Sequence, residues 1–377
     1  MKVFKYIFII SILSLFLSSC SNNNLSINEI PIDTNFIIEY ELSDNKFIAL
    51  NSKNKKDLFL YNSLEKDYNV LTSVHSEDKF LDTIVCNDKW IVWIEHESEI
   101  TSPTNFPYDW NLISYNMETK TKNLIDKSNF TTNINIYKYL TIPDSIIIED
   151  DILIYKKPYQ ENGSVLLDIV LYDLNKNEHK TLETVTNIPN ENIGNLSMDN
   201  GLIVWNKLFE LPSTEFPKYN FSYENYNIYT YDVKSEIKDS FKIDDECFYY
   251  SPYIFNNKIA LIKIFKDNFF YSEIAIYDLN NKSIDSVINQ NTIPNKDYIE
   301  NIKGNPKMNK DFLIWSQDCY GNNLVYDIKR KEFIEIIPND FLYKKQYYIN
   351  PYKLFRNKVY IQGIIDDKPI NSIYIIK

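Results

Sequence analysis

The sequence predicts an all-β fold, a propeller of about seven four-stranded blades, with six blades as the alternative. Three observations predict it: a pattern of strands and turns that recurs along the chain, a composition rich in β-forming residues, and a last repeat that ends one strand early. In the repeat, an apolar strand is followed by a second strand that ends in Tyr-Asp or Tyr-Asn, then a tight polar turn and a third strand. Repeats of roughly 40 to 60 residues with four short strands are typical of propeller blades.

The strand that ends in Tyr-Asp marks the repeat most clearly. Its closest copies are residues 168–175, 227–233 and 273–280, and looser copies carry Tyr61-Asn62, Tyr115-Asn116 and Tyr326-Asp327. Together with Tyr374, the tyrosines stand at 61, 115, 172, 231, 277, 326 and 374, so the spacings are 54, 57, 59, 46, 49 and 48. Each position predicts one blade.

Composition favours strands over helices. The 377 residues include 30 tyrosines and 22 phenylalanines but only 6 glycines. Tyrosine, phenylalanine, isoleucine and valine fit the pleated, half-buried surface of a sheet. The whole chain after the N-terminal segment is therefore expected to be β structure.

A run that is apolar on both faces precedes each Tyr-Asp strand, as expected of a strand packed between neighbouring blades. The clearest runs are residues 90–93, 152–155, 202–205, 258–262 and 312–315. Trp93, Trp205 and Trp315 end three of them and are expected to pack in the core. Segments with Ser-Pro or Asn-Pro, at 251–253, 305–308 and 350–352, are expected to be innermost strands, where proline is tolerated.

The last repeat stops at Lys377, soon after Tyr374, and lacks a following strand. An unpaired strand edge invites wrong pairing. Residues Ile27 to Pro31 form a short strand candidate ahead of the first repeat. We expect this strand to complete the last blade and close the ring, so that residues 27–377 form the propeller domain.

Residues 1–19 have the features of an export signal. Lys2 and Lys5 give a basic start, and an apolar run from Tyr6 to Leu17 is too short to span a bilayer of roughly 30 Å. Leu-Ser-Ser-Cys, ending at Cys20, is similar to the lipobox of bacterial lipoproteins, which implies a lipid on Cys20 and a tether over residues 20–26. The alternative is an ordinary secretory signal with an unrelated cysteine.

The charge of the chain narrows the class of partner. The formal net charge is −12, and loss of Lys2 and Lys5 with the signal makes it −14 (−12 − 2). Binding a phosphate backbone needs clustered Lys and Arg, so no nucleic-acid partner is expected. The lipid, rather than charge, would hold the protein to a membrane. The chain is expected to be monomeric.

The repeat resembles that of TolB-like and related propellers of bacterial envelope proteins. The resemblance rests on Tyr-Asp before an Asn/Lys turn and on Ser-Pro or Asn-Pro before an apolar strand. It extends over nearly the whole chain after the signal and implies the propeller fold. The Trp-Ser-Pro-Asp-Gly turn of that family is absent, and Asp199-Asn200-Gly201 is the nearest counterpart.

No constellation of catalytic or metal-binding residues stands out, so we expect no catalytic residues, metal or cofactor. The recurring aspartates occupy equivalent positions in separate blades, where a carboxylate accepts backbone N–H bonds of a turn; they are Asp173, Asp232, Asp278 and Asp327. The three histidines form no triad, and no nucleotide-binding motif is present. Cys86, Cys247 and Cys319 are widely spaced and are expected to be free, mostly buried thiols.

Aromatic residues in long connections are the candidate ligand-binding residues. The connections swell at residues 102–110, 158–163 and 211–226, all on the same face of a propeller. Rigid aromatic rings suit sugar surfaces or peptide side chains. The candidates are Tyr108, Trp110, Tyr159, Tyr219 and Tyr223. The alternative is that these rings only cap the ends of the blades.

The leading hypothesis is an exported, lipid-anchored protein of the cell membrane or surface whose propeller binds an envelope protein or glycan without catalysis. The rival is a propeller enzyme, a polysaccharide lyase or hydrolase, with two carboxylates from different blades converging at the channel. A scaffold with no ligand is the third possibility. Convergence of carboxylates favours the enzyme, and a polar funnel without such a pair favours binding.

Overall fold

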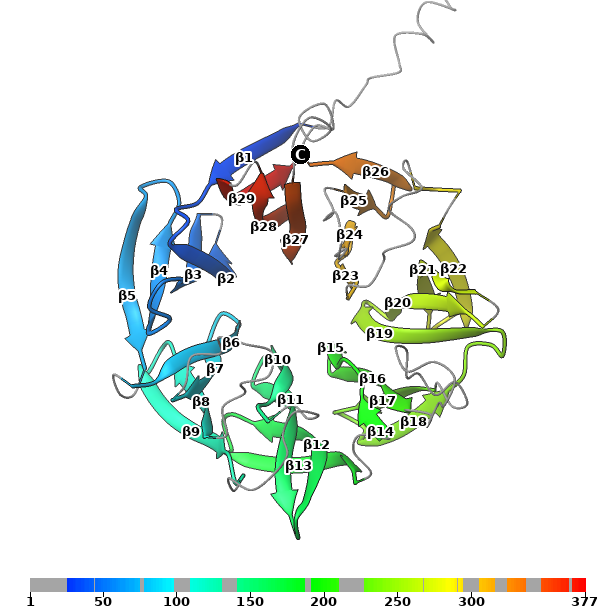
Figure 1. Cartoon of the computed structure of the whole chain (residues 1–377), viewed down its shortest axis with the longest axis horizontal. Coiled ribbons are helices and arrows are strands. Elements are labelled where there is room, and N and C mark those ends of the chain that lie inside the picture. The colour runs from blue at the N-terminus through cyan, green and yellow to red at the C-terminus, as the bar shows by residue number, and fades with distance from the viewer. Residues whose placement is uncertain are drawn as a thin grey trace, which may run out of the picture.

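A computed structural model describes residues 26–377 except 44, 75–77, 98–108, 131–140, 187–190, 210–226, 267, 290, 294–304, 316–323, 337–346 and 366–367. The described residues form β-strands in seven sheets, and no helix lies among them. The sheets follow one another around a ring (Figure 1). The predicted seven-bladed propeller is therefore confirmed, and the alternative of six blades is wrong.

The first three blades follow in chain order, each from its innermost strand outward. The first contains β2 (Phe36–Ser43), β3 (Lys46–Asn51), β4 (Asp57–Asn62) and β5 (Asp67–Ser73). The second contains β6 (Phe80–Cys86), β7 (Trp90–His96), β8 (Trp110–Asn116) and β9 (Thr121–Lys127). The third contains β10 (Asp144–Glu149), β11 (Ile152–Glu161), β12 (Ser164–Asp173) and β13 (Glu178–Val185).

The fourth blade has an innermost strand in two pieces, β14 (Glu191–Ile193) and β15 (Ser197–Asp199), followed by β16 (Leu202–Phe209), β17 (Ile228–Asp232) and β18 (Ile237–Phe241). The fifth contains β19 (Cys247–Phe255), β20 (Lys258–Phe265), β21 (Asn268–Asp278) and β22 (Ser283–Ile288). The sixth contains β23 (Lys307–Met308), β24 (Phe312–Ile314), β25 (Leu324–Asp327) and β26 (Glu332–Glu335). The seventh contains β27 (Tyr347–Phe355), β28 (Lys358–Ile365), β29 (Lys368–Ile376) and β1 (Ile27–Pro31).

Closure of the ring by the N-terminal strand is also confirmed. Strand β1 pairs antiparallel with β29 from Ile27 opposite Ile376 to Pro31 opposite Ser372, at the outer edge of the seventh blade (Figure 1). Ser26 and Lys377 exchange two backbone hydrogen bonds of 3.2 and 3.0 Å. Since neighbouring strands are antiparallel, Ser26 lies on the face that carries the tight turns.

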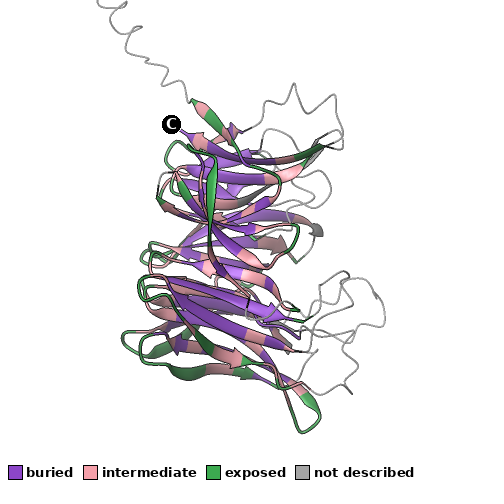
Figure 2. Cartoon of the chain, turned by 90° about the vertical axis from the view of Figure 1, so that its left-hand side faces the viewer, coloured by how far each residue is buried: buried purple, intermediate pink, exposed green. Residues whose placement is uncertain are grey.

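The core consists of layers between adjacent blades. Each of the seven hydrophobic clusters contains residues of the second and third strands of a blade. Figure 2 shows that long stretches of the strands are buried. Trp93, Trp205 and Trp315 are at most 1% exposed, so the expectation that they pack in the core is confirmed. Exposed residues gather at the turns and outer strands (Figure 2). No helix in the described part of the chain is long and apolar enough to cross a membrane.

The recurring aspartates hold tight turns, as expected. In each case Oδ1 accepts the backbone N–H groups two and three residues ahead, at 2.7 to 3.2 Å; the four residues are Asp173, Asp232, Asp278 and Asp327. Asn62 and Asn116 accept the same two bonds in the first and second blades. The hydrogen bonds of the turn explain why Asp or Asn occurs at the same position in these blades.

The cysteines agree with the expectation where the structure describes them. Cys86 and Cys247 are buried and free, and burial raises the pKa of both thiols. Cys319 lies outside the described residues. Buried thiols with raised pKa values are poor nucleophiles.

The buried side chain of Asn206 on β16 predicts a stabilising substitution. Asn206 is 0% exposed, and neither polar atom of its amide has a hydrogen-bond partner among the described residues. A buried unpaired polar group costs about 1 to 3 kcal/mol. Asn206→Leu, of similar shape, is therefore expected to raise the free energy of unfolding in urea by about 1 to 3 kcal/mol. Asn206→Asp, which buries a charge, should lower the free energy of unfolding. A Leu variant less stable than the wild type would contradict the prediction.

Candidate functional site

The centre of the ring holds a cavity of about 720 Å³, lined by inner strands of all seven blades. In each blade, one residue of the innermost strand pairs with the third residue of the second strand. We call this set the lysine ring; in blade order it is Tyr40, Val85, Ile147, Ser197, Tyr253, Lys307 and Lys353. Its two lysines come from adjacent blades, the sixth and the seventh.

A second set of cavity residues, the polar ring, stands two positions earlier in the second to sixth blades. Its members are Thr83, Ser145, Asn195, Ser251 and Asn305. The inner strands contain β-bulges here, and Thr83, Ser145 and Ser251 have φ angles of 43°, 48° and 53°. Non-glycine residues rarely adopt such angles, and bulges re-aim side chains. The same break separates β14 from β15 in the fourth blade.

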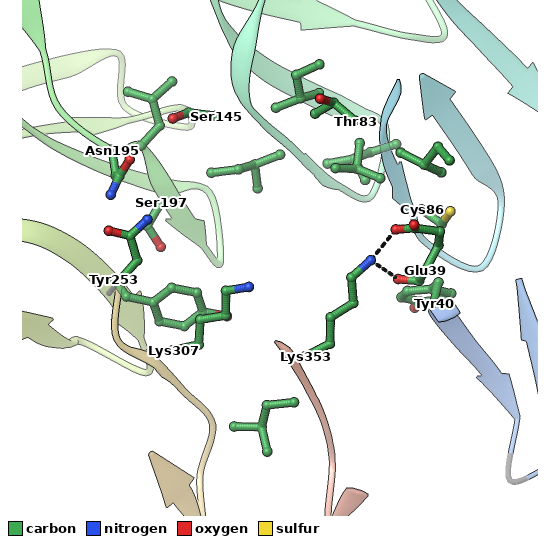
Figure 3. Close-up of a pocket in the computed structure, with 18 of the residues that line it drawn as sticks. Glu39, Tyr40, Thr83, Cys86, Ser145, Asn195, Ser197, Tyr253, Lys307 and Lys353 are labelled. Atoms are coloured by element: carbon green, nitrogen blue, oxygen red, sulfur yellow. Dashed lines mark hydrogen bonds and ion pairs between the residues drawn. The ribbon is translucent and has the colours of Figure 1, made fainter. Parts of the chain in front are cut away.

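Glu39 and Lys353 form an ion pair across the ring closure, from β2 to β27. The Lys353 ammonium donates to the Glu39 carboxylate and, at 2.9 Å, to the Glu39 carbonyl oxygen. Burial raises the pKa of Glu39 by more than Lys353 lowers it. Figure 3 shows the pair at the edge of the cavity.

Lys307 extends into the same cavity from β23 (Figure 3). Burial and the repulsion of the Lys353 ammonium lower the pKa of Lys307 to about 8, although Glu39 opposes the shift. Tyr253 lies beside Lys307 in Figure 3, and burial raises the pKa of its phenol. With a pKa of about 8, the Lys307 amine is mostly protonated at pH 7.

Asp82 is the second carboxylate of the cavity lining. It accepts the backbone N–H of Thr83 at 2.6 Å and faces His96 Nε2 at 3.6 Å. Burial alone would raise the pKa of Asp82, but the bonds to His96 and Thr83 outweigh burial and lower it. Asp82 and Glu39 interact electrostatically, and their pKa values move in opposite directions.

The polar ring is partly bonded to itself and to the blades. Asn195 Nδ2 donates to Ser251 Oγ at 3.2 Å. In the lysine ring, Ser197 Oγ accepts the backbone N–H of Ile254 at 3.0 Å. These bonds fix the side chains of the fourth and fifth blades and aim polar atoms across the cavity from Lys353 (Figure 3).

Lys307 predicts a pH-dependent stability. Its folded pKa of about 8 lies below the usual lysine value of about 10.4, so between these values the unfolded chain binds more protons, and stability should rise with pH. Lys307→Met should remove this slope and raise the free energy of unfolding at pH 7 by up to about 3 kcal/mol. Urea unfolding at pH 7 to 10 measures both quantities. If stability still rises with pH in Lys307→Met, the pH dependence belongs to another group.

Of the five aromatic candidates the structure describes two, Trp110 and Tyr159, and neither lines the cavity. The prediction that Trp110 is a loop platform is wrong: Trp110 begins β8, pairs with His96 and is 1% exposed, because the strand starts earlier than its loop-like neighbours indicate. Tyr159 is half-buried on β11 and does not line the cavity; burial and Asp168 raise its pKa to about 12. Tyr108, Tyr219 and Tyr223 lie outside the described residues.

Sequence reasoning missed the charged cavity residues. Lys307 and Tyr253 follow the prolines of segments that were expected to be innermost strands, and Lys353 lies two residues after Pro351. That proline pattern was the available signal. No group of three or more metal-ligating side chains occurs among the described residues.

Comparisons with known proteins agree with a propeller and assign no family. No protein-family model and no curated protein matches the chain. The β-propeller domain of the trilobed protease from Pyrococcus furiosus, described as having an open velcro topology, is similar with a TM-score of 0.54 at 11% identity, covering 94% of this chain and 92% of that one.

Two further solved structures are less similar. The oligogalacturonate lyase from Vibrio parahaemolyticus has a TM-score of 0.48 at 13% identity over 75% of this chain and 73% of that one. TolB from Acinetobacter baumannii has a TM-score of 0.41 at 12% identity over 91% and 79%. At these identities the likeness concerns the fold. The chain is a seven-bladed β-propeller with a charged central cavity.

Proposed function

We propose that this chain is an exported, lipid-anchored envelope protein whose propeller binds a protein or glycan through its central cavity, without catalysis. The observation that carries the proposal is the cavity of about 720 Å³ with Glu39, Lys307 and Lys353 in its lining. Burial of charged groups costs stability, and such groups with shifted pKa values concentrate at functional sites. A purely structural centre would be more stable with apolar side chains at these positions.

The place of Ser26 supports an orientation for the anchored protein. Ser26 pairs with Lys377 on the tight-turn face, so a tether that ends at Ser26 joins the propeller on that face. The connection between β3 and β4 lies on the opposite face, and its Lys55 lines the cavity. A ligand would thus enter from the side away from the membrane.

Lipidation of Cys20 is tested by metabolic labelling. Cells that express the full chain and take up a labelled fatty acid should transfer the label to the wild type and not to Cys20→Ser. The wild type should also remain with the membrane fraction, whereas the variant is released. Cys247→Ser is the matched control and should label like the wild type. Equal labelling of Cys20→Ser would contradict the proposed anchor.

The binding proposal is tested by capture from an envelope extract. The bait begins at Ser26, which keeps all seven blades and their closure. We expect the wild type to retain envelope material that Lys307→Met loses by at least tenfold, while the exposed turn variant Lys329→Met retains it. A Tyr159→Ala bait tests the one described aromatic candidate that is not fully buried. Equal capture by all baits, or by none, would contradict cavity binding.

One observation favours an enzyme as the second candidate. Glu39 and Asp82 come from adjacent blades, interact, and have pKa values shifted apart, which is the pattern of an acid and base pair. Binding accounts better for the geometry because each carboxylate is held by a partner, Lys353 or His96. An assay of acidic and neutral polysaccharides for new chain ends decides: cleavage lost in Asp82→Asn would establish the enzyme.

A further inference from the structure

The lysine ring is divided into a cationic and an uncharged side. Lys307 and Lys353 stand next to each other in the sixth and seventh blades. Tyr253 flanks them in the fifth blade, and Tyr40 flanks them in the first. The three remaining blades contribute uncharged side chains, which are Val85, Ile147 and Ser197. The only charges within this ring are thus two ammonium groups on one side.

The charge of the cavity differs in sign from that of the whole chain. Its described lining has three cations, Lys55, Lys307 and Lys353, and two carboxylates, Glu39 and Asp82, a balance of +1 (3 − 2). The chain as a whole carries −12. Glu39 forms an ion pair with Lys353, and Asp82 lies 3.6 Å from His96 Nε2. The described lining therefore carries a net positive charge, which attracts an anionic ligand.

The environment of Lys307 points to the same ligand charge. The charged or titratable groups of the described cavity lining besides Lys307 are Lys353 from β27, Glu39 and Tyr40 from β2, Lys55 from the β3–β4 connection, Asp82 and Cys86 from β6, and Tyr253 from β19. Repulsion from Lys353 outweighs attraction to Glu39 in the shift of its pKa. A carboxylate between the two ammonium groups would relieve this repulsion and form charge-assisted hydrogen bonds.

The polar ring supplies a second type of contact. Its members offer hydroxyl and amide groups over five blades, two positions before the lysine ring. Asn195 already donates to Ser251, and Thr83 Oγ1 to Asp82, so Asn195 Oδ1 and the Ser145 hydroxyl are the groups best placed for a ligand. Such groups bond to hydroxyls or amides of a small molecule.

We propose that the central cavity binds a ligand through a carboxylate seated between Lys307 and Lys353 and through hydroxyl or amide groups bonded to the polar ring. This inference rests on the proposed function and specifies its ligand chemistry. The same chemistry is found in a sugar acid and in the acidic end of a peptide. The tyrosines that flank the lysines on both sides provide ring faces for either one.

The test uses two matched pairs of probes in isothermal titration calorimetry at pH 7, with the chain from Ser26. Glucuronate is compared with glucose, and N-acetylglycine with N-acetylglycinamide, so that each pair differs mainly in the carboxylate. We expect the acid of at least one pair to bind at least tenfold more tightly than its neutral partner. The pair that shows the preference identifies the sugar or the peptide as the source.

Variants test whether the preference for the acid over the neutral probe arises in the cavity. Lys307→Met should bind acid and neutral probe equally, whereas Lys307→Arg and the surface variant Lys329→Met should keep the preference. At pH 10, where the Lys307 amine is neutral, the wild-type preference should fall about tenfold or more. Retention of the preference by Lys307→Met would overturn the site.

The outcomes separate this inference from the proposed function. If envelope material is captured through the cavity but neither probe pair shows an acid preference, the carboxylate inference fails and the binding function stands. If neither capture nor an acid preference is found, both fail. An acid preference that survives in Lys307→Met places the anion elsewhere on the propeller.

Discussion

A chain shortened to begin at Ile32, without β1, is expected to lose about 3 to 6 kcal/mol of its free energy of unfolding. The shortened chain loses the five register pairs between β1 and β29 and the bonds between Ser26 and Lys377. Each backbone hydrogen bond contributes a net of about 0.5 to 1.5 kcal/mol. Removal of β1 also leaves β29 as an exposed edge strand, which promotes pairing between molecules.

Urea denaturation followed by tyrosine and tryptophan fluorescence measures this loss, and light scattering measures association. The matched control begins at Ser26 and keeps the closure. The shortened chain should unfold at lower urea and scatter more light than the control at the same concentration. Equal stability of the two chains, to within about 1 kcal/mol, would show that β1 contributes little to closure.

Lys358→Met is expected to lower the free energy of unfolding by about 3 to 5 kcal/mol. Lys358 on β28 forms an ion pair with Glu41 on β2, so the pair joins the seventh blade to the first. Both side chains are buried, at 5% and 4% exposure. The variant leaves the Glu41 carboxylate buried without this cation, and an uncompensated buried charge is costly.

A double-mutant cycle separates the interaction energy between Lys358 and Glu41 from the cost of burying each side chain. Glu41→Met with Lys358→Met should lie within about 1 to 2 kcal/mol of the wild type, since apolar side chains of similar volume often replace a buried pair at no cost. The exposed pair of Lys180 and Glu236, at 3.1 Å, is the control. Its cycle should give a coupling of less than about 1 kcal/mol. Comparable coupling energies in both pairs would contradict the conclusion that the buried pair stabilises the contact between the seventh and the first blade.

The blades were predictable because their signals are local. The turn after Tyr172 needs an acceptor for two nearby backbone N–H groups, and Asp173 supplies it within three residues. The same requirement recurs in other blades and sets the repeat. The closing strand was predictable for a related reason, since the last repeat ended one strand early and Ile27 to Pro31 was available.

The cavity was not predictable in the same way. In five blades the lysine-ring residue follows a β-bulge of the inner strand, and a bulge shifts the side-chain alternation by one position. Lys307 and Lys353 then meet through the ring geometry although they are distant in sequence. The overall charge of −12 gave no indication of a cationic centre.

Trp110 shows the limit of reading loops from composition. Pro107, Tyr108 and Asp109 resemble a turn, and the indole was grouped with them. The partner strand extends to His96, so the pairing carries β8 back to Trp110 and buries the ring in the second blade. The end of a strand is decided by its partner as much as by its own residues.

Amine modification is the most direct test of ligand binding in the central cavity. The chain from Ser26 is methylated reductively, alone and with captured envelope material, and each lysine is quantified by mass spectrometry. The account predicts that captured material protects Lys307 and Lys353 at least fivefold while the exposed Lys329 reacts equally in both samples. Protection of surface lysines with undiminished modification of Lys307 would contradict it.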